Sequence, residues 1–408
     1  MRLAVVTSRY ASPRDPYARA FVHTRNQMYV RHGATVQVFV PTPRPYTYTF
    51  EGIPVAGLPA ADIVRRLDAF DAVLIHLLHP SHRAALDGRR VYDGLLRSGQ
   101  PTLFFIHGIE VQRVTRVRRA QLSLRRPRSL AIAGYHDFFQ IPVLKHYLRR
   151  FFDEHPAARF VTVSRWMLDE IHRNLHLNLQ PKAHVIPNGI HTRRFVFRDR
   201  WPQRHRLLAI RPLIWGGKYA VDLAVKTMHW LPTPFTLSLY GRGPDAARVR
   251  RWLQRHGLSQ RVRVVARFFE HAELPGIHAA HGIYYAVTRM DAQGVSMCEA
   301  MASGIPVVSF RVAGIPEFVH HGRTGLLVTP YRVEDAARAI QRLAEDRAFY
   351  TYLAEGARRL AEAIDLQRTT QYELRLARSL SARAPLPPPM WPPPFAASPD
   401  SSQGPEGG

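Results

Sequence analysis

The sequence predicts an α/β protein with two domains, each containing a parallel sheet covered by helices. Short apolar segments such as 3–8, 102–106 and 207–210 alternate with longer amphipathic segments along the chain. This alternation is typical of parallel strands joined by crossover helices. The length of 408 residues exceeds a usual single core, and the charged connector 193–206 contains few apolar residues. We therefore place a first domain at 1–195 and a second at 205–366.

The two ends of the chain are predicted to differ in order. Segment 3–8 is apolar but short and has no cleavage pattern after it, so we expect a first strand rather than a signal peptide. Segment 384–408 is rich in Pro, Ser and Gly. Such a composition buries too little apolar surface to offset the entropy of ordering, which predicts a disordered tail.

The first domain contains one leading site candidate, His107. The first strand should be followed by a loop at 9–17 and a helix at 18–31. Arg14 and Asp15 are the exposed polar residues of that loop and are candidates either for a ligand contact or for a plain turn. The apolar strand 102–106 ends at His107 and Gly108. Because open α/β sheets bind ligands at the carboxyl ends of their strands, His107 is a site candidate. The chain has 21 histidines, and the lesser candidates are His23, His76 and His79.

The first strand of the second domain leads into a loop with two cations. Strand 207–210 is followed by Arg211, two glycines and Lys218, and a helix is expected from Val221. Arg can direct two donors at phosphate oxygens, and Lys adds a point charge. Lys218 is one of four lysines among 57 basic residues, so its presence here is not explained by composition. This loop therefore predicts a phosphate site.

A second motif places two carboxylates on either side of a glycine. Asp291 and Glu299 flank Gly294, and the apolar segment 305–310 follows. A glycine loop that opens a helix presents free N–H groups to phosphate or sugar oxygens. Carboxylate oxygens accept hydrogen bonds from vicinal sugar hydroxyls. The motif predicts a nucleotide-sugar site.

This motif resembles the signature of the retaining glycosyltransferases of family 4. In that signature two glutamates separated by seven residues precede Ala-Met-Ala and Gly-x-Pro-Val-Val, and here Asp291 replaces the first glutamate. Segments 185–190, 237–243 and 314–328 resemble further family segments in the expected order. The resemblance implies the GT-B fold, two Rossmann-like domains facing across a cleft. It also implies a helix within 367–383 that packs back on the first domain.

The resemblance implies a role for each candidate in transferring a sugar from a nucleotide to a hydroxyl. The acceptor side is the domain 1–195, and the donor side is 205–366. The catalytic group would consist of His107 at the donor sugar, Arg211 and Lys218 at the diphosphate, and Asp291 facing the sugar. We expect the two cations to share one cavity with Glu299.

Five further residues are predicted to bind the donor. Glu299 would hold the ribose hydroxyls, and the backbone of Gly294, Val295 and Ser296 would face the sugar and diphosphate. Gly241 belongs to the glycine turn 237–243 of the same domain. The implied substrate is a UDP- or GDP-sugar, with no cofactor and no metal. The acid Glu317 is a candidate either for orienting the donor loop or for stabilising a helix.

The net charge of +26 bears on partners and location. Basic residues interrupted by apolar ones occupy 113–128 and 144–151, a pattern suited either to an anionic membrane face or to a solvated helix. No segment approaches the ~20 apolar residues that span a bilayer. We expect a cytoplasmic enzyme, soluble or peripheral to the inner face of the membrane, with a glycan, lipid-linked or small-molecule acceptor and no nucleic acid partner. The single Cys298 excludes an internal disulfide.

Two alternatives remain open from the sequence. A nucleotide-sugar epimerase of similar two-domain shape would bind the same donor without an acceptor. A polyanion-binding protein would use the arginines alone and show salt-dependent binding, but it would leave the segment 291–308 unexplained.

Overall fold

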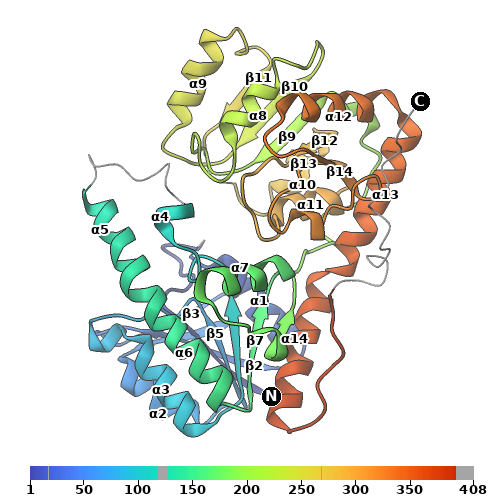
Figure 1. Cartoon of the computed structure of the whole chain (residues 1–408). Helices are drawn as coiled ribbons and strands as arrows, with labels where there is room; N and C mark the ends of the chain where they lie inside the picture. The colour runs from blue at the N-terminus through green and yellow to red at the C-terminus, as the bar shows by residue number, and fades with distance from the viewer. Residues whose placement is uncertain (17, 118–126, 268, 392–408) are drawn as a thin grey trace.

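The computed structural model describes residues 1–16, 18–117, 127–267 and 269–391. They form two α/β domains, one above the other in Figure 1, each with helices on both faces of its sheet. The first sheet has eight strands in the order β3-β4-β2-β1-β5-β6-β7-β8, and the second has six in the order β11-β10-β9-β12-β13-β14. The predicted fold class is confirmed.

The first sheet is parallel except at one edge. Its strands are β1 Arg2–Thr7, β2 Thr35–Pro41, β3 Tyr46–Phe50, β4 Ile53–Leu58, β5 Ala72–His76, β6 Thr102–Ile106, β7 Ala158–Thr162 and β8 Ala183–Val185. Its main helices are α1 Ala20–Arg31, α2 Ala60–Leu67, α3 Gly88–Ser98, α4 Val114–Val117, α5 Pro127–Tyr135, α6 Ile141–Glu154 and α7 Arg165–Leu175. Strand β1 pairs with β2 and β5, so its apolar residues are fully buried. The antiparallel pair β3 and β4 is not indicated by the alternating rhythm of the sequence.

The second sheet is entirely parallel. Its strands are β9 Arg206–Ile210, β10 Thr236–Tyr240, β11 Val262–Val265, β12 Ile283–Tyr285, β13 Val307–Phe310 and β14 Gly325–Val328. Its helices are α8 Val221–Thr227, α9 Ala246–Arg255, α10 Leu274–Ala279, α11 Val295–Ala302, α12 Val333–Glu345 and α13 Arg347–Ala363. Strand β9 lies at the centre, so the loop that follows it opens at the middle of the sheet edge.

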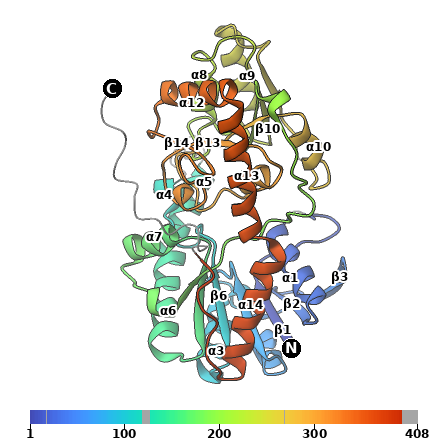
Figure 2. The same ribbon diagram turned by 90° about the vertical axis from the view of Figure 1, so that its right-hand side faces the viewer.

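The last helix returns to the first domain. Figure 2 shows α13 and then α14, Leu366–Ser381, passing from the second domain to the first along one side. Helix α14 packs on α1, where Glu373 and Arg25 form a fully buried ion pair with 3.2 Å between Oε1 and Nε. The Tyr29 hydroxyl donates to the second oxygen of Glu373 at 2.5 Å.

The buried pair predicts a large stability effect. Replacing Glu373 by alanine should lower the free energy of unfolding by about 3–5 kcal/mol, because the Arg25 charge would stay buried without its partner. Replacing both residues by methionine should restore much of the loss. Denaturant unfolding measures both, with Glu362→Ala, in the exposed Arg358 pair, as a control expected to cost under about 1 kcal/mol. Equal losses for Glu373→Ala and the control would contradict this role.

Part of the predicted disordered tail is packed. Leu386 and Met390 lie against the apolar cluster between α14 and the first sheet, and Trp391 is buried in the second domain. The Trp391 ring stacks on Phe318 with 5.0 Å between centroids, and its Nε1 donates to Glu317 at 3.3 Å. The prediction of disorder is wrong for 384–391 because these three apolar side chains find partners. Residues 392–408 lie outside the described part.

The basic segment 113–128 is only partly described. Arg118, Arg119, Arg125 and Arg126 lie outside the described residues. Within the described ranges, none of the helices combines the length and apolar character needed to cross a membrane.

Candidate functional site

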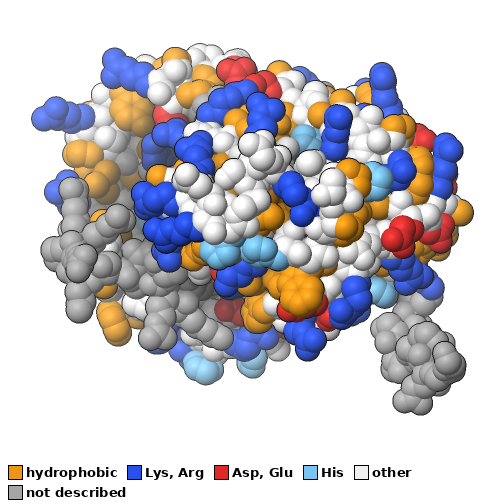
Figure 3. All heavy atoms as spheres, turned by 90° about the horizontal axis from the view of Figure 1, so that it is seen from above, with side chains coloured by type: hydrophobic (Ala, Val, Ile, Leu, Met, Phe, Trp, Pro, Cys, Tyr) orange, Lys and Arg blue, Asp and Glu red, His pale blue; other side chains and the backbone are white. Residues whose placement is uncertain are grey.

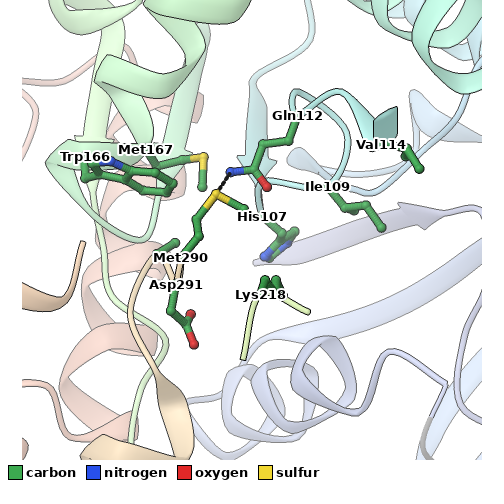
Figure 4. Close-up of a pocket in the computed structure, with 10 residues that line it drawn as sticks. His107, Ile109, Gln112, Val114, Trp166, Met167, Lys218, Met290 and Asp291 are labelled. Atoms are coloured by element: carbon green, nitrogen blue, oxygen red, sulfur yellow. Dashed lines mark hydrogen bonds between the residues drawn. The ribbon is translucent and has the colours of Figure 1, made fainter. Parts of the chain in front are cut away.

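A cavity of about 120 Å³ lies between the two domains, where strands of both sheets end. We call it the cleft cavity, and Figure 4 shows its lining. The first domain contributes His107, Ile109, Gln112, Val114, Trp166 and Met167, and the second contributes Lys218, Met290, Asp291 and Ala292. The Gln112 amide and the Met290 sulfur are 3.7 Å apart across the cleft (Figure 4). The cavity thus joins three of the four predicted catalytic residues.

His107 is held in place at the end of β6 by three neighbours. Its Nε2 is 3.0 Å from Nδ1 of His76, which ends the adjacent strand β5. Its backbone N–H donates to Oε1 of Glu110 at 2.8 Å. The Phe21 ring of α1 lies against the imidazole with 4.7 Å between centroids. The predicted minor candidate His76 therefore contacts His107, and Glu110 was not predicted from the sequence.

Burial keeps both imidazoles neutral. It lowers the pKa of His107 well below 6.5, and the nearby charges of Arg25 and Arg19 lower it further. The pKa of His76 is likewise lowered well below 6.5, first by burial and then by His107. Burial raises the pKa of Glu110 to about 7, although three backbone N–H groups oppose the shift. A neutral His107 can exchange hydrogen bonds with a sugar hydroxyl but carries no charge for a phosphate.

This geometry predicts the effect of removing His107. His107→Ala should lower the rate of sugar transfer about tenfold, the cost of one lost hydrogen bond to substrate, and should change nucleotide affinity much less. Steady-state kinetics and nucleotide titration measure the two quantities, with the exposed His146→Ala as control. A larger loss in nucleotide affinity than in transfer would place His107 at the phosphates instead.

The loop from Arg211 to Lys218 follows β9 and is fixed by surrounding contacts. The N–H of Trp215 donates to Asp245 at 2.9 Å, and that of Gly216 donates to Asp222 at 3.1 Å. Gly241 lies directly behind this loop, since a Cβ there would come within 2.0 Å of the Arg211 carbonyl oxygen. Gly241 lines neither the cavity between the domains described above nor the larger one described below, and its lack of a side chain allows the close packing; its donor contact stays a prediction.

Arg211 and Lys218 are both cations without a carboxylate partner among the described residues. Arg211 is buried, its Nε has no hydrogen-bond partner, and its charge opposes the burial-raised pKa of Tyr284. The Tyr284 hydroxyl in turn donates to the Ser296 hydroxyl at 2.8 Å, so Arg211 lies near the start of α11. Lys218 lines the cleft cavity, with its Nζ 4.7 Å from the centroid of the Tyr219 ring.

Arg289 fixes the end of the loop from Arg211 to Lys218, a role that was not predicted from the sequence. Its guanidinium donates to both oxygens of Asp222, at 2.9 and 2.7 Å, and to the carbonyl of Gly217 at 2.9 Å. Its N–H donates to the carbonyl of Lys218 at 2.6 Å. Arg289 lies just before the predicted Asp291, which is the signal that could have drawn attention to it.

The loop 291–296, which we call the donor loop, opens helix α11. Asp291 Oδ1 accepts from the N–H of Gly294 at 3.1 Å and more weakly from Gln293 at 3.4 Å. Gly294 has φ 78°, a conformation that favours glycine. The N–H groups of Met297 and Cys298 bond to the Gly294 carbonyl, whereas those of Val295 and Ser296 precede the intrahelical bonds. The Gly294 amide is therefore engaged, and the next two are available to an anion.

Glu299 lies one turn further along α11 and faces a second cavity of about 510 Å³, the hinge cavity. This cavity is lined by α1, by the connector 188–195, by 270–272 and by Val295. Burial raises the pKa of Glu299 to about 8, and the charge of Arg194 opposes the shift. His271 Nδ1 is 3.8 Å from its Oε1, and no hydrogen bond to the carboxyl is recorded in the described part. The carboxyl can therefore accept from a ligand.

The predicted site residues fall into two groups on either side of the donor loop. His107, Lys218 and Asp291 line the cleft cavity, whereas Val295 and Glu299 line the hinge cavity. The other predicted residues, Arg211, Gly241, Gly294 and Ser296, line neither. The expectation that Arg211, Lys218 and Glu299 share one cavity is therefore not met. Asp291 and Ala292 line the cleft cavity and Val295 lines the hinge cavity, so the segment that leads into α11 contributes to both.

Glu317 links the two domains. Its carboxylate accepts from the N–H groups of Arg165 and Trp166, at 2.9 and 2.8 Å, at the start of α7. The side chain of Ser164, which caps α7, accepts from Met167 N at 3.3 Å. Glu317 thus stabilises the contact of the domains beside the cleft cavity. In the described ranges, no three His, Cys, Asp or Glu side chains gather as a metal site would require.

Two family models match the chain in succession. Residues 3–194 match the model described as Glycosyltransferase Family 4. Residues 204–346 match the model described as Glycosyl transferases group 1. The two matches meet at the predicted connector between the domains.

Curated relatives match shorter stretches. The chain is 28% identical over 149 residues to an alpha-D-kanosaminyltransferase of Streptomyces kanamyceticus, covering 36% of this chain and 38% of that enzyme. It is 28% identical over 236 residues to a glycogen synthase of Mycobacterium tuberculosis, covering 56% of each. The chain thus spans less than two thirds of either relative.

Solved structures match over nearly the whole chain at low identity. Anabaena HepE in complex with UDP and glucose has a TM-score of 0.68 at 16% identity, covering 93% of this chain and 100% of that one. A sucrose-phosphate synthase from Thermosynechococcus elongatus has a TM-score of 0.67 at 17% identity, covering 94% and 100%. These likenesses establish the arrangement of the two domains.

Proposed function

Because the chain belongs to the group 1 glycosyl transferases of family 4 and has the GT-B fold, we propose that it transfers a sugar from a nucleoside diphosphate to an acceptor hydroxyl. The reaction retains the anomeric configuration and needs no metal. The observation that carries the proposal is a pair of cations without carboxylate partners among the described residues: Arg211 lies near the start of α11, and Lys218 lines the cleft cavity with Asp291.

The donor extends along the donor loop from one cavity to the other. Its ribose hydroxyls donate to Glu299 in the hinge cavity, and its diphosphate lies at the N–H groups of Val295 and Ser296. The positive end of the α11 dipole favours that charge. The sugar enters the cleft cavity, between His107 and Asp291. This path explains why the predicted residues are divided between two cavities.

The chemistry follows from where charge develops. The bond between the anomeric carbon and the diphosphate breaks as the acceptor hydroxyl attacks, so negative charge grows on the leaving phosphate. Lys218 and Arg211 stabilise that charge more in the transition state than in the ground state. The departing phosphate oxygen takes the acceptor proton, because the lowered pKa of His107 makes its imidazole a weak base and Glu110 does not line the cleft cavity.

The acceptor is a glycan or a lipid-linked hydroxyl, and we place the enzyme in the cytoplasm at the inner face of the membrane. What supports a membrane surface is the helix from α5 into α6, where Ile132 is 62% exposed and Phe138 78% exposed. Lys145 and Arg149 lie further along it. Figure 3 shows Lys and Arg spread over the second-domain face rather than gathered there in one groove, which does not favour a polyanion channel.

The membrane proposal predicts the behaviour of one double variant. Replacing Ile132 and Phe138 together by serine should reduce sedimentation with anionic vesicles severalfold, since less apolar surface is buried in the headgroup region. Transfer to a water-soluble acceptor should be unchanged. Sedimentation equal to that of the unmodified protein would remove these residues from a membrane surface.

A panel of nucleotide sugars tests the proposed function. UDP, GDP and their sugars are compared for their effect on Tm, since a ligand at a hundred times its Kd adds about 2.7 kcal/mol of stability. Because HepE was solved in complex with UDP, the uridine nucleotides are tested first. The donor that stabilises best is then incubated with and without acceptor. A glycosylated product formed only with acceptor is expected, whereas an isomerised donor without acceptor would identify an epimerase. Absence of stabilisation by any nucleotide would contradict the proposal.

A further inference from the structure

The donor loop is tied to the first domain through one buried side chain. Gln293 is 2% exposed. Its Oε1 accepts from the N–H of Asn188 at 2.7 Å, and its Nε2 donates to the Asn188 carbonyl at 2.9 Å. One side-chain amide thereby satisfies both backbone groups of a residue more than 100 positions earlier in the chain. Asn188 belongs to the turn that ends the first domain.

Asn188 is in turn anchored to the helices of the first domain. Its side-chain Oδ1 accepts from Arg25 Nη2 on α1 at 3.0 Å. Arg25 is the partner of Glu373 on α14 in the buried ion pair. A continuous series of contacts therefore runs from α14 through α1 and Asn188 to Gln293. Each member is buried or half-buried, so the series has little freedom to shift.

The contact between Gln293 and Asn188 also fixes the donor loop, because Gln293 lies within that loop. Its own N–H and that of Gly294 both donate to Asp291, and Val295 begins α11 immediately afterwards. Holding the Gln293 side chain against Asn188 thus fixes Asp291 and the start of α11 relative to the first domain, which contains His107. This contact therefore holds the two sides of the cleft cavity in a fixed position relative to each other.

We propose that Gln293 is a positioning residue that sets the donor loop in register with the first domain, so that Asp291 and His107 face the same sugar. The inference rests on the proposed function and deepens it. Gln293 acts through its neighbours and lines neither the cleft cavity nor the hinge cavity. Its effect should therefore fall on transfer rather than on nucleotide binding, which depends on Lys218, Glu299 and the α11 amides.

Glutamine can bond both the N–H and the carbonyl of Asn188 because its side chain presents one acceptor and one donor side by side. Leucine has a similar size and offers neither. An ionised glutamate offers two acceptors, so the Asn188 carbonyl would lose its donor and face a negative charge. A protonated glutamic acid again offers one acceptor and one O–H donor. This difference separates a hydrogen-bonding role from a packing role.

The test compares Gln293→Leu and Gln293→Glu with the unmodified protein, using UDP-glucose or the donor selected by the panel. Gln254, exposed on α9, provides matched controls as Gln254→Leu and Gln254→Glu. At about pH 9, where an introduced glutamate is ionised, both Gln293 variants should lower kcat at least about tenfold, the cost of leaving buried backbone groups unpaired. The Kd for UDP should change less than about threefold, and the controls should leave both quantities unchanged.

A pH series supplies the decisive comparison. As the pH falls from about 9 to about 6, through the pKa of about 8 expected of a buried glutamic acid, the activity of Gln293→Glu relative to the unmodified protein should rise. That of Gln293→Leu should not. The charged and titratable groups near the introduced carboxyl are Arg25, Asp291 and the Cys298 thiol. All three are present in both variants and in the unmodified protein.

The outcomes separate this inference from the proposed function. Absence of nucleotide binding and of transfer in the unmodified protein would overturn both. Transfer by the unmodified protein with wild-type kcat in both variants would overturn the role of Gln293 alone. Parallel losses of Tm, UDP affinity and kcat, without recovery of Gln293→Glu at low pH, would show a merely structural role and would also overturn it.

Discussion

Replacing Lys218 by alanine is expected to lower kcat by about a hundredfold to a thousandfold, the usual effect of removing one group that stabilises transition-state charge. Lys218 lines the cleft cavity and has no carboxylate partner among the described side chains, so its charge is available to a departing diphosphate. The affinity for UDP should also fall, but by less, because charge on the leaving phosphate is greater in the transition state. Single-turnover kinetics and UDP titration measure the two effects.

Lys226→Ala provides the matched control. Lys226 is exposed on α8, eight residues further along the same domain. The control should keep full activity, and both variants should unfold at the temperature of the unmodified protein. Unchanged kinetics in Lys218→Ala would remove this residue from the diphosphate site. Equal losses in both variants would point to a general effect of charge.

At a pH above about 8, where the Glu299 carboxyl is ionised, Glu299→Gln is expected to weaken nucleotide binding by about tenfold to a hundredfold, the range for hydrogen bonds to a charged group. The carboxylate can accept from both ribose hydroxyls, whereas an amide offers one acceptor and a competing donor. The comparison of UDP with 2′,3′-dideoxy-UDP isolates the contact. The unmodified protein should discriminate strongly between the two ligands, and Glu299→Gln should discriminate little. Equal discrimination by both proteins would contradict the assignment of Glu299 to the ribose hydroxyls.

The same residue predicts a pH dependence of stability without nucleotide. Burial raises the pKa of Glu299 from 4.5 to about 8. A carboxyl with a raised pKa in the folded state contributes stability that is fully present below its unfolded pKa of 4.5 and is lost as the pH rises through about 8. The unmodified protein should therefore lose stability relative to Glu299→Gln across that window. Tm values of the two proteins that stay parallel across the window would contradict this.

Much of the fold could be predicted from the sequence because local pattern and tertiary structure agree. The apolar segments 102–106 and 207–210 are central strands in which both faces are buried, so they appear in the sequence as continuous apolar runs. The loops that follow them contain His107 and Lys218, which the strand-end rule places in the cleft. The positions of these two residues in the cleft therefore follow from their places just after the two strands.

The contacts that organise the site could not be predicted in this way. Gln293 meets Asn188 and Glu317 meets the start of α7 only after the two domains have docked. Arg289 appears in the sequence as one more arginine among many, and its role depends on Asp222. Glu110 is polar next to an apolar strand and reads as a surface residue. Its pKa near 7 arises from burial that only the folded domain creates.

The division of the site between two cavities also depends on side-chain packing. The motif places Asp291 and Glu299 eight positions apart, which suggests one shared pocket. The structure directs Asp291 toward the cleft cavity and Glu299 toward the hinge cavity. The charge of Arg211 likewise opposes the burial-raised pKa of Tyr284 and Tyr285, two residues of a strand that is distant from Arg211 in sequence.

The most direct test of the central claim is a crystal structure of the protein with UDP, or with whichever nucleoside diphosphate stabilises it most. The account predicts ribose hydroxyls within hydrogen-bond distance of Glu299. It also predicts the diphosphate at the N–H groups of Val295 and Ser296, with its terminal oxygens reaching Lys218. A nucleotide bound away from the start of α11, with Glu299 and Lys218 both untouched, would contradict it.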